Sequence, residues 1–194
     1  SEGQWELAGL LKRQLEELGA EEVELTENCF VFASIPATKG LERAKTVGLL
    51  AHLDTAPDCP GKDVKPVLHP RYDGGTIVLE NGLTIDPRRY PELLRYIGDD
   101  IVTSDGTTLL GADDKAGIAI IMETVSELMT NADRPHGKIR IGFTPDEEVS
   151  VGGASILDVD GFGADYGITV DGDGVGELNF ETFNGCTVKV EIEG

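Results

Sequence analysis

Three short apolar runs of this sequence each end in a cluster of ionisable side chains. The runs and their clusters are residues 47–51 before His52 and Asp54, residues 138–143 before Glu147 and Glu148, and residues 166–170 before Asp171 and Asp173. Continuous apolar runs of this length are typical of strands buried on both faces of a parallel sheet. Because functional groups gather beyond the carboxyl ends of parallel strands, we expect the three clusters to meet at one edge of an α/β sheet.

A fourth acidic stretch, GADDKAG at residues 111–117, precedes an apolar run that predicts a buried helix over residues 118–129. Its small residues allow the backbone to approach a ligand closely, and the adjacent carboxylates of Asp113 and Asp114 suggest that this ligand is a cation. Taken alone, the stretch is better explained by helix capping through one of the carboxylates. The recurrence of ionisable clusters at three strand ends favours a shared cation site instead.

The combined set contains one imidazole and several carboxylates but no cysteine, which suits zinc, cobalt or manganese. So many carboxylates would repel one another, which favours two metal ions that share a bridging acid. Asp54 lies two residues from His52 and shares its strand face, so we expect it to orient the imidazole ring. Glu147 and Glu148 point to different sides of an extended chain, so one can bind metal while the other serves as general base.

Each cluster also has a simpler explanation when it is considered singly. His52 fits a hydrogen-bonded core histidine, and Glu147 with Glu148 fits the exposed start of a helix. For any one cluster, such an explanation is at least as good as a role in a cation site. Four clusters at equivalent points of the chain favour a common site.

The composition limits the classes of protein to which the chain can belong. Its 194 residues carry a formal charge of −20, with 40% apolar and 27% charged residues, which indicates a globular chain and makes nucleic acid and membrane surfaces poor partners. No apolar run is long enough to cross a membrane, and no signal peptide opens the sequence. The three cysteines share no metal-ligand spacing, and their odd number favours a reducing, cytoplasmic location.

The first residues predict a capped helix. Ser1 and Gln4 fit a capping box, apolar residues follow at positions 8, 11, 15 and 18, and Gly19 fits a helix stop. Further signals predict strands over residues 23–25 and 30–35, a long surface excursion over residues 56–75, a two-residue hairpin loop at Asn81-Gly82 and a short helix over residues 91–97.

The four stretches that contain the candidate metal-site residues also resemble sequences of a known family. They are AHLDT at residues 51–55, TTLLGADDKAGI at 107–118, FTPDEE at 143–148 and TVDG at 169–172. Together they resemble the M20 metallopeptidase family, and within it the tripeptide aminopeptidases, nearly from end to end of the chain. The resemblance implies a zinc-peptidase-like three-layer α/β sandwich with a mixed, mainly parallel sheet. Residues 1–184 would form the N-terminal part of its catalytic domain, and residues 185–194 a strand leading towards a lid and dimerisation domain.

The resemblance also implies an activity, namely a two-zinc aminopeptidase that removes the N-terminal residue of tripeptides. Asp54 would orient His52, and Glu147 would be the general base that activates the attacking water. A further metal-binding histidine of the family has no counterpart in this sequence, so we expect this chain alone to be inactive. The family dimerises through its lid domain, so the resemblance also implies that the intact protein is a homodimer. The metal ligands implied are His52 and Asp171 for one zinc, Glu148 for the second zinc, and Asp113 as the bridge, with cobalt or manganese as substitutes.

Three other interpretations stay open. Another M20 member, a dipeptidase, carboxypeptidase or amide-bond deacylase, would share the metal motifs and prefer a different end of its substrate. A truncated chain would bind one metal at His52, Asp113 and Asp171 without hydrolysing anything. An acidic cation-buffering module explains the charge but not the strand-end placement, and it predicts that Glu147→Ala leaves peptidase activity unchanged.

Overall fold

The computed structural model describes residues 1–131, 133–149, 152–172, 174, 176–181, 188 and 190–192. Asp173 and most of the strand predicted over residues 185–194 lie outside these ranges. No helix in the described part of the chain is long and apolar enough to cross a membrane. The elements are, in chain order, α1 (Glu2–Glu17), β1 (Glu21–Leu25), β2 (Val31–Ile35), β3 (Val47–His52), β4 (Pro66–His69), β5 (Ile77–Val78), β6 (Thr84–Ile85), the 3-10 helix η1 (Pro91–Tyr96), β7 (Ile101–Ser104), α2 (Ala112–Thr130), β8 (Ile139–Thr144), α3 (Gly152–Ser155), α4 (Val159–Phe162) and β9 (Tyr166–Thr169).

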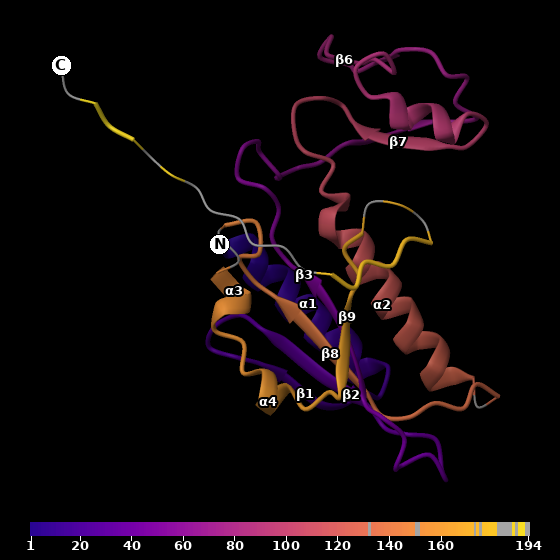
Figure 1. The fold of residues 1–194 in the computed structure, drawn as a ribbon, viewed down its shortest axis with the longest axis vertical. Coiled ribbons are helices and arrows are strands. Elements are labelled where there is room, and N and C mark those ends of the chain that lie inside the picture. Colours follow the sequence, from indigo (N-terminus) through magenta and orange to yellow (C-terminus); the bar gives the residue numbers. More distant parts are fainter. Residues whose placement is uncertain are drawn as a thin grey trace.

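A five-stranded sheet in the order β1-β2-β8-β3-β9 contains the three predicted strand ends (Figure 1). β3 is parallel to both β8 and β9, whereas β2 is antiparallel to both β1 and β8. The register pairs His52 with Thr144, the last residue of β8, and Leu50 with Thr169, the last residue of β9. The three parallel strands therefore end at the same edge, and the predicted α/β class with a mixed sheet is confirmed.

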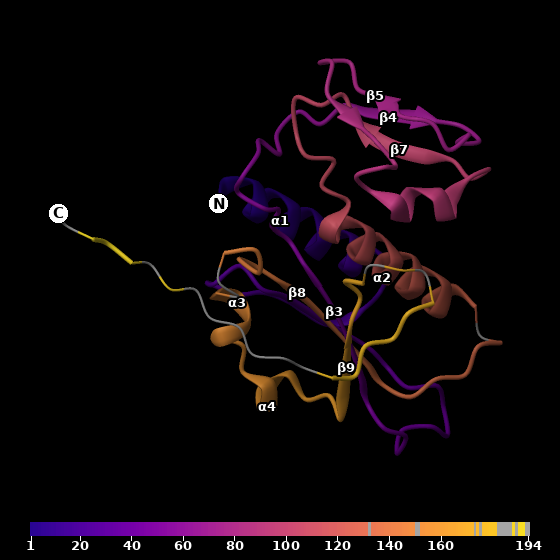
Figure 2. The same cartoon turned by 45° about the horizontal axis from the view of Figure 1, so that its top comes forward.

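Helices α1 and α2 lie on the same face of this sheet (Figure 2). The predicted three-four spacing of apolar residues in α1 is confirmed. Burial of one aliphatic or aromatic side chain stabilises a fold by about 1.5–3 kcal/mol, so this shared core holds both helices firmly against the strands. Its buried members include Ala8, Leu11 and Leu15 from α1, Ile118, Ile121 and Val125 from α2, and Val31, Ile141 and Phe143 from the sheet.

The opposite face of the sheet is covered by α4. The Phe162 ring lies on two glycines, Gly48 and Gly142, and a Cβ on Gly48 would come within 2.6 Å of the ring. Arg140 Nε donates a hydrogen bond to the Phe162 main-chain oxygen at 2.8 Å, and its guanidinium lies 5.5 Å from the ring centroid. Glycines on neighbouring strands thus make room for an aromatic side chain, which places helical segments on both faces of the sheet.

Two expectations about α1 and β9 are wrong. The Ser1 side chain makes no capping hydrogen bond, and the Gln4 side chain contacts Asp146 after β8 instead of the helix start. β9 is exposed instead of buried, with Ile168 at 41% exposure. It is the last strand in the sheet order and pairs with β3 alone among the described strands, so an apolar sequence was not a sufficient sign of burial.

The segment between β3 and α2 forms a lobe beyond the N-terminal end of α2 (Figure 1). It contains the antiparallel ribbon β4-β7, the β5-β6 hairpin and η1, which replaces the short helix predicted over residues 91–97. The hairpin at Asn81-Gly82 is confirmed, but its loop holds three residues, because Leu79 N donates to Leu83 O and Gly82 N donates to Leu79 O. Gly82 has φ +85°, a conformation that suits glycine in this type of loop.

Candidate metal centre

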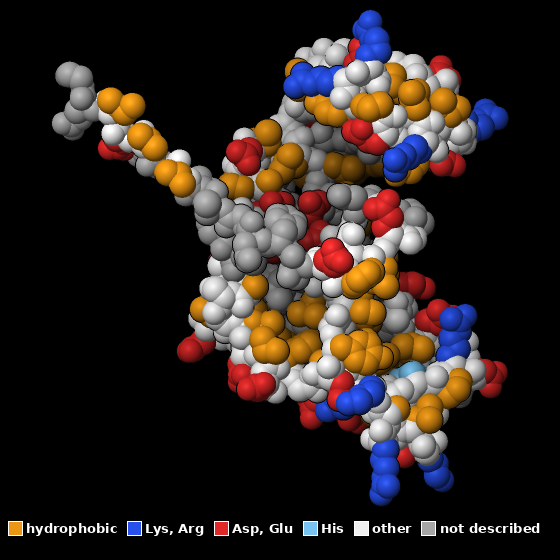
Figure 3. Space-filling view, viewed as in Figure 1, with side chains coloured by type: hydrophobic (Ala, Val, Ile, Leu, Met, Phe, Trp, Pro, Cys, Tyr) orange, Lys and Arg blue, Asp and Glu red, His pale blue; other side chains and the backbone are white. Residues whose placement is uncertain are grey.

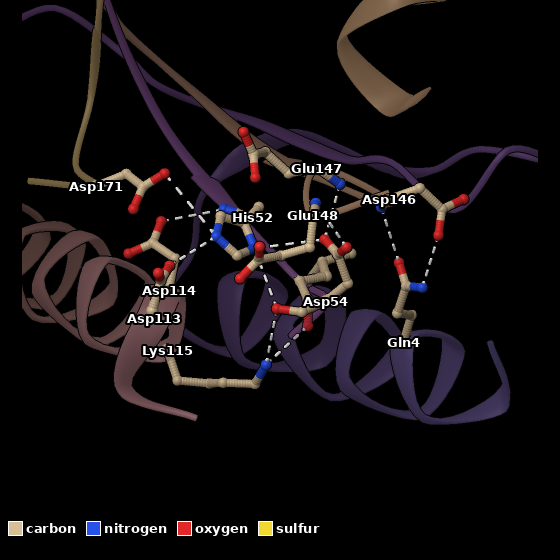
Figure 4. A network of polar contacts seen from close by, with 11 residues as sticks. Gln4, His52, Asp54, Asp113, Asp114, Lys115, Asp146, Glu147, Glu148 and Asp171 are labelled. Carbon is tan, nitrogen blue, oxygen red and sulfur yellow. Dashed lines mark hydrogen bonds and ion pairs between the residues drawn. The ribbon is translucent and has the colours of Figure 1, made fainter. Parts of the chain in front are cut away.

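His52 is the last residue of β3 and is 2% exposed. Its Nδ1 lies 3.0 Å from the main-chain oxygen of Asp54, which can only accept a hydrogen bond, so Nδ1 carries a proton. Its Nε2 lies 2.9 Å from Asp113 Oδ1 and 3.8 Å from Asp171 Oδ2 (Figure 4). In the neutral ring the lone pair of Nε2 therefore faces these carboxylates, as it does in metal-binding histidines.

The loop at the start of α2 carries two carboxylates with different environments. The Asp113 side chain is 70% exposed and faces His52, whereas Asp114 is buried. Asp114 accepts hydrogen bonds from the main-chain N–H groups of His52 at 3.1 Å and Gly117 at 3.0 Å. A Cβ on Gly117 would collide with the Val170 carbonyl oxygen and with the Asp114 carboxylate. Glycine at this position thus lets α2 start directly against the residue that follows β9.

Asp54 connects the end of β3 to the loop after β8. Its Oδ1 accepts a hydrogen bond from Glu147 N at 2.9 Å, and its Oδ2 accepts one from Glu148 N at 3.0 Å. The same Oδ1 lies 3.3 Å from His52 Nδ1, farther than the Asp54 main-chain oxygen. The carboxylate therefore fixes the backbone of both glutamates, and its role in orienting His52 stays a prediction.

Two overlapping groups of side chains converge at this edge of the sheet. Within each group, one potential ligand atom per residue lies within 4.8 Å of the others. The groups bring together all four predicted ligands and add Asp114, which the acidic stretch suggested as part of a cation site but which the ligand set implied by the resemblance left out. An imidazole with several carboxylates fits zinc or another divalent transition metal. In the described part of the chain the groups are His52 with Asp113 and Glu148, and His52 with Asp114 and Asp171.

Acidic side chains gather in the hollow between the lobe and the sheet (Figure 3). Burial, reinforced by Asp171 and opposed by main-chain donors, raises the pKa of Asp114 to about 6 from its ordinary 3.8. Burial and the surrounding carboxylates also raise the pKa of Glu147, although the His52 ring opposes this shift. Burial disfavours the charged His52 ring, but the carboxylates, led by Asp113, outweigh it and raise the pKa of His52. A cation bound among these groups would relieve their repulsion.

Lys115 belongs to the same network, although sequence reasoning assigned it no role. Its Nζ donates to the main-chain oxygens of Leu53 at 3.0 Å and Asp54 at 3.2 Å. Burial lowers its pKa, although nearby carboxylates act in the opposite direction. The ammonium group thus holds the turn after β3. The position of Lys115 next to Asp114 in the acidic stretch is the sequence signal from which its part in the network could have been predicted.

Comparisons with known proteins find relatives of this chain in sequence and in fold. The model of peptidase family M20/M25/M40 matches residues 105–192. The chain is 45% identical over 197 residues to peptidase T of Alkaliphilus oremlandii (strain OhILAs), an alignment that covers 100% of this chain and 48% of that protein. It therefore spans about half the length of the curated relatives that it matches.

Two crystal structures have a similar fold. Aminopeptidase PepT from Bacillus cereus ATCC 10987 is 28% identical with a TM-score of 0.64, over 90% of this chain and 39% of that one. A tripeptidase from Staphylococcus aureus subsp. aureus Mu50 is 26% identical with a TM-score of 0.60, over 86% of this chain and 37% of that one. With the sequence matches, these likenesses show that residues 105–192, the part that the family model matches, belong to peptidase family M20/M25/M40, and that the rest of the chain resembles peptidase T proteins as well.

Proposed function

We propose that the complete protein containing this chain is a metallo-aminopeptidase that releases the N-terminal residue of tripeptides. The observation that carries the proposal is the convergence of imidazole and carboxylate ligand atoms around His52, with Glu147 beside them. Similarity to proteins named peptidase T, aminopeptidase PepT and tripeptidase supports the substrate class.

The proposed centre holds two zinc ions, and cobalt or manganese suits the same donors. Bound zinc would polarise the scissile carbonyl and lower the pKa of the attacking water. His52 would bind through Nε2, because its Nδ1–H is engaged by the Asp54 main-chain oxygen. The proposed ligands are His52 and Asp171 for one ion, Glu148 for the other, and Asp113 for both.

Glu147 is the proposed general base. It takes a proton from the attacking water and returns it to the amine that leaves, and its raised pKa suits both transfers. Asp54 Oδ1 holds the Glu147 main-chain N–H at 2.9 Å, so the base is fixed relative to the end of β3. A positioned base of this kind contributes about 10²–10⁴-fold to the rate.

The proposal also includes a lid domain, a dimeric state and a cytoplasmic location for the complete protein. A lid domain beyond the strand of residues 185–194, and dimerisation through that lid, rest on the family resemblance alone. A cytoplasmic location is supported by the free cysteines Cys29 and Cys59. An M20 dipeptidase, carboxypeptidase or deacylase would use the same ligands, so substrate preference has to separate these activities.

The deciding experiment presents the zinc-loaded complete protein with a tripeptide, the same tripeptide acetylated at its N-terminus, a C-terminal amide of it, and a dipeptide. We expect release of the first residue from the free tripeptide and little turnover of the acetylated one, because an aminopeptidase requires a free amino group. Release of the C-terminal residue, or equal hydrolysis of the acetylated peptide, would assign one of the other M20 activities.

The role of the base is tested by Glu147→Gln, which we expect to lower kcat by about 10²–10⁴-fold with metal content retained. Glu6→Gln is the matched control, because Glu6 is exposed on α1 and the chemical change is the same. Unchanged kcat in Glu147→Gln would favour the cation-buffering interpretation.

A further inference from the structure

Gln4 connects α1 to the loop that carries Glu147 and Glu148. Its side chain is 7% exposed and reaches a residue 142 positions away in the sequence. Gln4 Nε2 donates to Asp146 Oδ1 at 2.8 Å, and the Asp146 main-chain N–H donates back to Gln4 Oε1 at 3.2 Å (Figure 4). One neutral amide thus satisfies both a carboxylate and a backbone donor, as a capping side chain does at a helix end.

Three consecutive main-chain N–H groups in this loop are accepted by side chains from elsewhere in the fold. The N–H of Asp146 is bound by Gln4, and those of Glu147 and Glu148 are bound by the two oxygens of Asp54. Asp54 follows β3 and Gln4 belongs to α1, so the loop is held between two separate elements. The direction in which both glutamates leave the loop depends on these bonds.

The loop needs such support for two reasons. Asp146 has φ +54°, a left-handed conformation that residues other than glycine adopt at some cost. A cavity of about 340 Å³ also adjoins the contact, lined in part by Trp5, Pro145, Gly152 and Ile156. The two hydrogen bonds with Gln4 therefore help to fix Asp146 beside this cavity, together with the bond that its main-chain oxygen accepts from Gly152 N at 2.9 Å.

We propose that Gln4 is a positioning residue that fixes the loop bearing the general base Glu147 and the metal ligand Glu148. The inference rests on the proposed function, because the roles of these glutamates belong to it. Gln4 acts through Asp146 and touches neither the substrate nor the metal. A carboxylate in its place would repel Asp146, and an apolar side chain would leave both bonds unmade, so an amide is required.

The test uses the complete protein and the variant Gln4→Glu, with kcat, KM and zinc affinity as readouts. We expect kcat for a tripeptide to fall about 10-fold with KM nearly unchanged, and zinc affinity measured by competition with a chelator to fall about 10-fold. Gln14→Glu is the matched control, since Gln14 is exposed on the same helix and undergoes the same change. It should alter neither quantity.

The double variant Gln4→Glu/Asp146→Asn reverses the donor and the acceptor of the side-chain bond. The amide introduced at position 146 can donate to the carboxylate at position 4, whose second oxygen can still accept the main-chain N–H. We therefore expect kcat and zinc affinity to recover most of what Gln4→Glu loses. Gln4→Met serves if Gln4→Glu does not fold, because it removes both bonds without adding a charge, and kcat and zinc affinity should again fall.

A purely structural role would lower the free energy of unfolding while kcat and zinc affinity of the folded protein stayed unchanged, and this result would overturn the proposal. Absence of recovery in the double variant would overturn it as well. Failure of the proposed function is distinguishable, because the protein would then lack tripeptide turnover or Glu147→Gln would leave kcat unchanged. Zinc affinity would still report on Gln4 in that case.

Discussion

The carboxylates at the two ends of the central sheet have different partners: those at one end pair with Lys and Arg side chains, whereas those at the other end cluster around His52. At the amino ends of β3, β8 and β9, Asp165 is paired with Lys45 at 2.5 Å, and Glu22 with Lys138 at 2.9 Å and Arg140 at 3.1 Å. We call these residues the amino-end rim. The carboxyl-end rim consists of His52, Asp54, Asp113, Asp114, Glu147, Glu148 and Asp171, and there the Lys115 ammonium donates to main-chain oxygens.

The direction of the pKa shifts follows this difference. Hydrogen bonds from Ser34 and Lys138 lower the pKa of Glu22 to about 2, and the bond from Lys45 lowers the pKa of Asp165. At the other rim burial raises the pKa of Asp114 to about 6 and also raises that of Glu147. The carboxylates of the amino-end rim are neutralised by Lys and Arg side chains of the chain itself. The negative charge of the carboxyl-end rim stays concentrated, as expected of a site that binds a metal cation.

The largest effect is expected from Asp113→Asn at the carboxyl-end rim. Asp113 faces His52 Nε2 at 2.9 Å, so its loss should weaken zinc binding by more than about 100-fold, beyond the effect typical of residues that support a ligand. The free energy of unfolding of the metal-free protein should change by less than about 0.5 kcal/mol, because the side chain is 70% exposed. Chelator competition and urea denaturation measure the two quantities.

Asp165→Asn at the amino-end rim is the control for this comparison. Zinc affinity should not change, because the partner of Asp165 is Lys45. Equal loss of affinity in the two variants would mean that the difference between the rims does not reflect metal binding.

A large loss of stability is expected from Asp54→Asn. Asp54 accepts two main-chain N–H groups, and an amide can accept one of them but turns its own N–H₂ towards the other. We expect the metal-free protein to lose about 2–4 kcal/mol of unfolding free energy, in the range of hydrogen bonds to a buried charge. Asp58→Asn, at an exposed position nearby, should change it little. A loss below about 1 kcal/mol for Asp54→Asn would show that other contacts hold the loop.

The pH dependence of the metal-free protein should reveal Asp114. Its pKa is about 6 in the folded state against 3.8 ordinarily, so between these values the folded protein holds a proton that the unfolded chain releases. Its contribution to the free energy of unfolding therefore falls as the pH rises from about 4 to 6, by about 2–3 kcal/mol. The raised pKa of His52 acts in the same direction at higher pH, because stability from the charged ring is lost above its folded pKa.

The measurement is urea denaturation of wild type and Asp114→Asn at several pH values without metal. The variant cannot ionise, so its stability relative to wild type should increase between about pH 4 and 7. A constant difference across this range would contradict the unusual pKa. Saturating zinc should reduce the dependence, since a bound cation favours the ionised carboxylate.

Sequence reasoning anticipated the carboxyl-end rim because its signals are local. His52 ends one strand and Asp171 follows closely after another, and parallel pairing brings the carboxyl ends of these strands together. Burial was less predictable, because it depends on neighbours: β9 reads as a buried strand yet lies at the edge of the described sheet. The Gln4–Asp146 contact spans 142 residues, and the local capping pattern pointed to a different partner.

The smallest expected effect belongs to Glu22→Gln at the amino-end rim. The lowered pKa of Glu22 means that its stabilising contribution is present above about pH 4.5 and is lost as the pH falls towards 2. Because the side chain is 58% exposed, solvent weakens its pairing with Lys138 and Arg140, and we expect a loss of about 0.5–1 kcal/mol at neutral pH that shrinks in high salt. Urea denaturation at low and high salt measures this change. Zinc affinity should stay constant, since the amino-end rim takes no part in metal binding, and a shift of several-fold would show that the two rims are coupled through β3 and β8.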